Sequence, residues 1–92
     1  MNEKERKGHW EVYPIKVKGL KDESFHNPGF GLTIDIKKVG STQGIGLFDG
    51  KKFVKSLDPG DVFKRKFDND PVMKGTAESG VANIEISFYV PE

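Results

Sequence analysis

The chain has 92 residues, which is the size of a single domain. It contains no cysteine, so neither a disulfide nor a thiolate metal site can supplement its hydrophobic core. Fifteen basic residues balance 14 acidic ones, and the net charge of +1 excludes a strong attraction of the whole molecule toward nucleic acid or anionic lipid.

The first eight residues, MNEKERKG, are mostly polar or charged and are predicted to form a flexible tail before a single domain over residues 9–92. No apolar segment follows as in a signal peptide, and no apolar run is long enough to span a bilayer. The sequence does not determine the cellular compartment. We expect the cytoplasm or a virion if the chain is complete, and an extracytoplasmic location if it is a domain of a surface protein.

The segment HWEVYPIKVKGL is the first predicted strand. Trp10 and Val12 share one phase of the alternation, whereas Ile15 begins the opposite phase. Pro14 lies where the phase changes, and a proline cannot donate a hydrogen bond to a ladder. The pattern therefore predicts an edge strand with a bulge at this proline, which keeps both apolar sets facing the core.

The two clearest strands are FGLTIDIK, residues 30–37, and VANIEISFYV, residues 81–90. In both, apolar residues alternate with polar or small ones at a period of two, and neither segment matches a helical period. Asn27-Pro28-Gly29 forms a predicted turn before the first of them. We expect each segment to lie in a sheet with one face buried.

The middle of the chain is punctuated by turn residues. Asp49-Gly50 is predicted to form a two-residue hairpin between strands at IGLF and KKFVKSL. Asp58-Pro59-Gly60-Asp61 fits a type II turn, and the strand DVFKRKF follows it. Residues 68–80 are predicted to form a long loop with one helical turn at Pro71–Lys74.

These segments predict an all-β fold of six or seven short strands without a long helix. We predict an antiparallel β-sandwich, immunoglobulin-like in outline, with a small β-barrel as the alternative. The predicted core consists of Trp10, Val12, Ile15, Phe30, Leu32, Ile34, Ile36, Leu47, Ile84, Ile86 and Phe88.

No motif in the sequence predicts catalysis, a cofactor or a metal. The glycines between Gly44 and Gly50 resemble a phosphate loop, but no helix follows to place its N-terminus at a phosphate. His9 and His26 have no partner at metal-ligand spacing. We therefore predict no catalytic, cofactor-binding or metal-binding residues, and a protein that is not an enzyme.

The sequence does offer a candidate binding surface. It consists of the cations Lys51, Lys52, Lys64, Arg65 and Lys66. Cations interleaved with aromatic residues on a small barrel are typical of single-stranded nucleic acid binding. Lysines on edge strands also prevent edge-to-edge aggregation, and strand alternation places Arg65 on the opposite face from its two neighbours.

The segments HNPGFGLTIDIKKVG and VKSLDPGDVFKRKF resemble the CARDB-type immunoglobulin-like modules of bacterial and archaeal surface proteins. Asn27-Pro28-Gly29 and residues 57–60, Leu-Asp-Pro-Gly, hold the turn positions that carry this resemblance. The resemblance implies a non-catalytic spacer or adhesion module in an extracytoplasmic chain.

Two functions follow from these observations. The first is a non-enzymatic binding or assembly module, of surface-protein or viral structural type, that acts on a protein partner through an exposed sheet face or edge strand. The sequence does not decide whether the chain forms homo-oligomers, and membrane insertion is not expected. The alternative is a small β-barrel that binds single-stranded nucleic acid through the lysines and arginine of the candidate surface.

Overall fold

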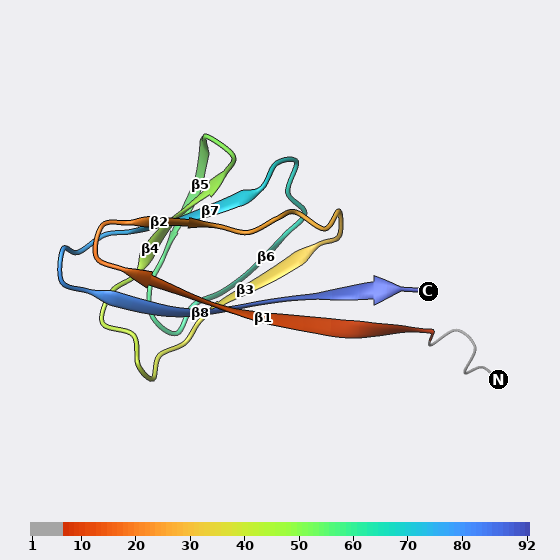
Figure 1. Cartoon of the computed structure of the whole chain (residues 1–92), viewed down its shortest axis with the longest axis horizontal. Coiled ribbons are helices and arrows are strands. Elements are labelled where there is room, and N and C mark those ends of the chain that lie inside the picture. Colours follow the sequence, from red (N-terminus) through yellow and green to blue (C-terminus); the bar gives the residue numbers. More distant parts are fainter. Residues whose placement is uncertain (1–6) are drawn as a thin grey trace.

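The computed structural model describes residues 7–92 and shows eight strands joined by turns and loops (Figure 1). Residues 1–6 of the predicted tail lie outside the described residues. The strands are β1 (Gly8–Lys18), β2 (Asp22–Ser24), β3 (Leu32–Ile36), β4 (Ile45–Asp49), β5 (Lys52–Leu57), β6 (Val62–Arg65), β7 (Pro71–Gly75) and β8 (Val81–Pro91). Between residues 7 and 92 there is no helix of a length and apolarity suited to crossing a membrane.

The strands form two four-stranded antiparallel sheets, in the orders β1-β8-β3-β6 and β2-β7-β4-β5. Successive strands alternate between the sheets, except that β4 and β5 pair as a hairpin. This is the double-sheet jelly-roll arrangement found in capsid, lectin and cupin domains. The predicted sandwich is confirmed. Its topology is not that of an immunoglobulin domain, in which the first two strands are neighbours in one sheet.

The core lies between the two sheets, where alternate residues of β3, β4 and β8 are buried. Ile15 and Phe30 are partly buried and pack against this core. The buried apolar residues are Val17, Leu32, Ile34, Ile36, Ile45, Leu47, Leu57, Phe67, Met73, Ala82, Ile84, Ile86 and Phe88. The predicted phases of β3 and β8 are therefore confirmed.

The prediction for the start of β1 was wrong. Trp10 and Val12, expected in the core, are 63% and 52% exposed. β1 pairs with β8 in one unbroken register, from Gly8 opposite Pro91 to Lys18 opposite Val81, with no bulge. Because alternation is never interrupted, Trp10 and Val12 lie on the opposite face from the inward-facing Val17.

The backbone explains why Pro14 does not break this strand. Just beyond the two ends of β1, the Glu92 N–H donates to the Lys7 carbonyl and the Gly19 N–H donates to the Gly80 carbonyl. These bonds place the odd-numbered residues of β1 in hydrogen-bonded pairs with β8. The nitrogen of Pro14 consequently faces the free edge of the sheet, where the ladder needs no donor.

Two strands, β2 and β7, were not predicted from the sequence, and β7 lies where a loop was expected. Residues 71–74, predicted as a helical turn, instead lie in β7, which is paired on one side with β2 and on the other with β4. Pro71 is the first residue of β7, a position where a strand tolerates proline. Met73 is fully buried and explains why the segment becomes a central strand.

The tight turns differ in one respect from the prediction. Asp49 pairs with Lys52, so the two loop residues are Gly50 and Lys51 rather than Asp49 and Gly50. Gly50 alone takes a positive φ, of 62°, which suits a glycine at the first central position of a type II′ hairpin. The predicted type II turn at residues 58–61 is confirmed, since Gly60 has a φ of 98° and the Asp61 N–H donates to the Asp58 carbonyl.

Asp49 ends β4 and holds the connection between β6 and β7. Its carboxylate is buried and accepts hydrogen bonds from the N–H groups of Asp68 at 3.1 Å and Asn69 at 2.7 Å. The Arg65 guanidinium lies 3.5 Å away. These donors hold the pKa of Asp49 below its usual value, and the Asp68 N–H has the largest effect.

We expect Asp49→Asn to flatten the acid dependence of stability. A carboxyl whose pKa is lowered by folding stabilises the protein above its unfolded pKa, and this contribution is lost as pH falls through the lower folded pKa. Urea unfolding midpoints should therefore drop more for the wild type than for the variant between about pH 5 and pH 2. Equal drops in the two proteins would contradict the proposed role of this carboxylate.

The core assignment predicts that Ile34→Ala and Ile86→Ala each lower the free energy of unfolding by about 2–5 kcal/mol, because each leaves a cavity between the sheets. Val12→Ala is the matched control on an exposed strand face and should change it by no more than about 0.5 kcal/mol. Chemical denaturation measures all three. A control as destabilised as the core variants would show that the phase of β1 is wrong.

Candidate functional site

One end of the sandwich is formed by two strands alone. β3 pairs with β8 only from Ile84 to Ser87. Beyond that point, Phe88–Pro91 of β8 is paired only with Gly8–Glu11 of β1. We call these two segments the arm, and Figure 1 shows it extending past the sheet that contains β2, β4, β5 and β7.

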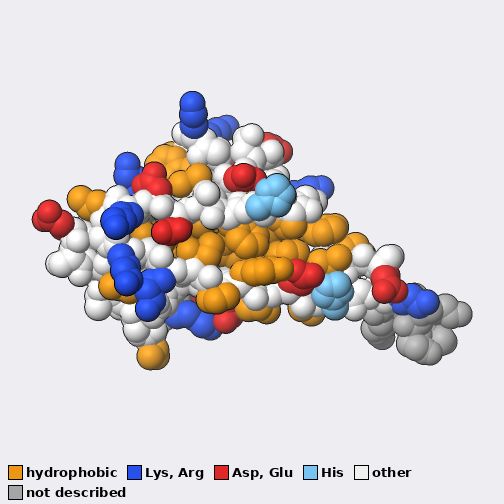
Figure 2. Space-filling model, in the orientation of Figure 1, with side chains coloured by type: hydrophobic (Ala, Val, Ile, Leu, Met, Phe, Trp, Pro, Cys, Tyr) orange, Lys and Arg blue, Asp and Glu red, His pale blue; other side chains and the backbone are white. Residues whose placement is uncertain are grey.

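The inner side of the arm borders an apolar hollow of about 400 Å³. We call it the arm hollow, and Figure 2 shows hydrophobic side chains gathered along the middle of this face. Phe88 is at its centre, with ring centroids of Tyr13 at 5.9 Å and of Phe25 and Phe30 at 6.2 Å. The lining residues are Glu11, Tyr13, Phe25, His26, Pro28, Phe30, Phe88 and Val90.

Polar groups line the rim of the arm hollow. The Tyr13 hydroxyl donates to one oxygen of Glu11 at 2.5 Å, and His9 Nε2 lies 2.8 Å from the other oxygen. These contacts lower the pKa of Glu11, and the hydrogen bond from Tyr13 has the largest effect. The same carboxylate raises the pKa of the Tyr13 phenol. His26 also lines the hollow, with its Nδ1 3.9 Å from an Asp70 oxygen.

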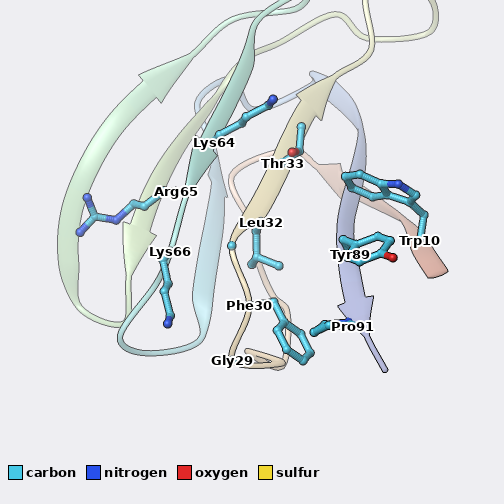
Figure 3. A pocket seen from close by; sticks show the side chains of 11 residues that line it. Trp10, Gly29, Phe30, Leu32, Thr33, Lys64, Arg65, Lys66, Tyr89 and Pro91 are labelled. Atoms are coloured by element: carbon cyan, nitrogen blue, oxygen red, sulfur yellow. The ribbon is translucent and has the colours of Figure 1, made fainter. Parts of the chain in front are cut away.

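A second site lies on the outer side of the arm. Trp10 of β1 packs edge-to-face on Tyr89 of β8, with ring centroids 5.6 Å apart. Beside this pair is a hollow of about 620 Å³, which we call the outer-face groove (Figure 3). Its lining residues are Trp10, Gly29, Phe30, Gly31, Leu32, Thr33, Lys64, Arg65, Lys66, Tyr89 and Pro91.

The strand registers explain how these residues meet. Ser87 of β8 pairs with Thr33 of β3, and Thr33 pairs with Lys64 of β6. Gly31 just before β3, Tyr89 of β8 and Lys66 just after β6 line the same groove beyond these pairs. The groove therefore runs across β3, from aromatic rings on one side to two lysines on the other.

The structure divides the five cations of the candidate surface. Lys64 and Lys66 line the outer-face groove. Arg65 lies between them, but its guanidinium points away from Trp10, toward Asp49 and the ring of Phe67 (Figure 3).

Lys51 and Lys52 belong to the other sheet, in the turn after β4 and at the start of β5. Lys51 lines a separate hollow with Phe48 and Val72. The candidate set is therefore distributed over both sheets rather than gathered at one groove.

Sequence reasoning missed the aromatic half of the groove. Trp10 was predicted in the core, and no motif in the sequence singled out Tyr89. The exposure of Trp10 could have been predicted from unbroken alternation over residues 8–18. That reading requires the nitrogen of Pro14 to face the free edge of the sheet, where no bulge is needed.

Comparisons with known proteins support only the fold. No family model matches the chain, and no curated protein matches it. Its structure is similar to that of the polyketide cyclase RemF from Streptomyces resistomycificus, with a TM-score of 0.61 and 11% sequence identity. The match covers 90% of this chain but only 55% of the cyclase, so the chain spans about half of that protein.

This match corrects the resemblance to CARDB-type modules. The chain follows the β-sandwich of the cyclase over nearly its whole length, whereas the suspected resemblance rested on two turns. Those turns are present, with Gly29 and Gly60 at positive φ. Such turns occur in many sandwiches and do not define the topology.

The rim geometry predicts a measurable titration. Tyr13→Phe removes the largest cause of the lowered Glu11 pKa, so the pKa of this carboxyl should move up toward its ordinary value. Carboxyl carbon shifts followed by NMR across the acid range measure this change. An unchanged Glu11 pKa in the variant would show that the Tyr13–Glu11 hydrogen bond does not form in solution.

Proposed function

We propose that the chain is a non-enzymatic assembly module in which two copies pack together through their arm hollows. The observation that carries this proposal is an aromatic surface left uncovered by the second sheet. Tyr13 points to the inner side of the sandwich and yet is 41% exposed. A soluble protein rarely leaves a contiguous aromatic surface open unless another surface covers it.

The arm itself favours a partner. A two-stranded ribbon is marginally stable alone and gains stability when its faces pack against other elements. On the inner side, Phe88 and Val90 of the arm line a hollow with Tyr13 of β1 and with the loop that carries Phe25 and Phe30. Packing against a second molecule removes this apolar surface from water and holds the ribbon in place.

The polar groups on the rim favour a second copy as the partner. The lining of the arm hollow includes one acid, Glu11 from β1, and one imidazole, His26 from the loop after β2. In a two-fold interface the same patch of both copies meets. If residue i of the first copy contacts residue j of the second, then residue j of the first copy contacts residue i of the second. Such a rotation can bring each Glu11 toward the His26 of the other molecule while the rings pack at the centre.

A sheet face is a better contact surface here than the edge of β1. Edge pairing needs a row of outward N–H donors, and Pro14 interrupts that row in the middle of the strand. The absence of a cysteine and of a catalytic motif in the sequence supports a role in binding rather than in catalysis.

Sedimentation equilibrium of the full chain tests the proposal. We expect a concentration-dependent dimer for the wild type and a monomer for Tyr13→Lys, because the substitution removes the packing ring and introduces a charge that the interface would have to take out of water. Val39→Lys is the matched control, since Val39 is 89% exposed on the loop between β3 and β4. This control should dimerise as the wild type does.

Two results would contradict the proposal. One is a wild-type chain that stays monomeric up to millimolar concentration. The other is a dimer that survives Tyr13→Lys unchanged, which would place the contact elsewhere. Urea unfolding of both variants confirms that any loss of the dimer does not come from loss of the fold.

A further inference from the structure

We propose that the outer-face groove binds single-stranded nucleic acid, with a base against Trp10 and Tyr89 and successive phosphates at Lys64 and Lys66. This site lies on the opposite face of the arm from the arm hollow, so it does not depend on the assembly proposed above. It keeps two of the five cations of the candidate surface and adds the aromatic residues that the structure places beside them.

The aromatic side of the groove suits a base. Trp10 is exposed over most of its surface and packs edge-to-face on Tyr89, so the pair forms an open platform at the outer side of the arm. Bases stack on exposed aromatic rings with little regard for sequence, because every base has a π-face. In a duplex these faces are already stacked on one another, so the platform favours single strands.

The cationic side suits a phosphate backbone. Lys64 lies in β6, Lys66 follows directly after the last residue of that strand, and both line the groove; in extended backbone their Cα atoms are about 6.7 Å apart. That interval is close to the spacing of successive phosphates in an extended single strand. Within residues 7–92 neither lysine has an ion-pair partner, whereas Lys37 on the same sheet pairs with Asp35 and Glu85.

The distance between the two sides selects the class of anion. Where Thr33 of β3 pairs with both Ser87 of β8 and Lys64 of β6, the aromatic and cationic strands are separated by two interstrand spacings, about 9.5 Å. In a nucleotide the phosphate and the base lie at opposite ends of the sugar, which matches this separation. In an acidic polysaccharide the carboxylate or sulfate is attached to the ring itself, so the flat face and the charge would have to lie much closer together.

The floor of the groove permits close approach. A methyl group added at Gly31 would meet no atom within 4 Å, so the space above this residue is open. A glycine lets a ligand come near the backbone. The neighbouring Thr33 lines the same groove and offers a hydroxyl that both donates and accepts.

Trp10 is the only tryptophan in the chain, so its fluorescence reports on this groove directly. We expect quenching when the full chain is titrated with an oligothymidylate of roughly ten nucleotides. Two phosphate contacts predict that log affinity falls with log salt with a slope of about −1.4. A duplex of the same length should bind more weakly, because its bases cannot reach the platform.

Charge variants locate the site. The double variant Lys64→Gln/Lys66→Gln should lose most of the affinity and bring the salt slope close to zero. The matched control Lys51→Gln/Lys52→Gln removes the same charge from the other sheet and should bind as the wild type does. A control that loses as much affinity as the first pair would overturn the groove as the site.

Two further variants test the platform and the floor by anisotropy of a labelled oligonucleotide. Trp10→Leu should weaken binding roughly 5- to 150-fold, as expected for the loss of stacking on one base. Gly31→Leu starts a side chain at a Cβ position with no atom within 4 Å, extends it into the groove, and should weaken binding to a similar extent. Urea midpoints close to the wild-type value show that neither variant acts by unfolding the chain.

Two outcomes would overturn the proposal. The first is the absence of binding and of Trp10 quenching at low salt. The second is equal or tighter binding of dextran sulfate with the same quenching, which would identify an acidic polysaccharide as the ligand. Because Tyr13 does not line the outer-face groove, Tyr13→Lys should leave nucleic acid binding unchanged, so failure of the dimer and failure of this site are separable.

Discussion

The unbroken pairing of β1 with β8 is the constraint on which the rest of the structure depends. β8 lies between β1 and β3, so its register fixes which residues of both neighbours face the core. The odd-numbered residues of β1 and the even-numbered residues of β8 face inward together. A shift of one residue in this register would turn Trp10 toward the core and Tyr13 toward solvent, and neither the outer-face groove nor the arm hollow would form as described.

The same pairing explains why the arm presents two different surfaces. Within the sandwich, one face of the β1–β8 pair is covered by the second sheet, and the core residues Val17 and Ile84 lie there. At the arm that cover ends, so the inward phase becomes an aromatic hollow. The outward phase carries Trp10 and Tyr89 toward the lysines of β6. The proposed assembly and the proposed ligand binding therefore use opposite faces of one ribbon.

Sequence patterns predicted the sandwich because β3 and β8 alternate without interruption, and residues such as Ile34 and Ile86 could face only a core. The error in β1 came from Pro14. A proline between two apolar pairs indicates a bulge if its nitrogen is taken to face the neighbouring strand. The sequence does not show which side of an edge strand is free, and that side decides whether a proline disrupts the ladder.

The candidate site was harder to predict because it depends on pairing between distant segments. The alternation of residues 64–66 correctly separated Arg65 from its neighbours. Nothing local indicates that Gly31, Lys66 and Tyr89 line one groove, since that neighbourhood arises from the jelly-roll strand order. β7 was missed for a similar reason, because a short segment around Met73 becomes a strand only between β2 and β4.

Acrylamide quenching of Trp10 fluorescence tests the register of β1 most directly. The structure predicts a tryptophan that emits near the wavelength of indole in water and is quenched almost as readily in the native chain as in urea. A blue-shifted emission that resists quenching until the chain unfolds would place Trp10 in the core. That result would contradict the continuous β1–β8 pairing, and with it the positions of both faces of the arm.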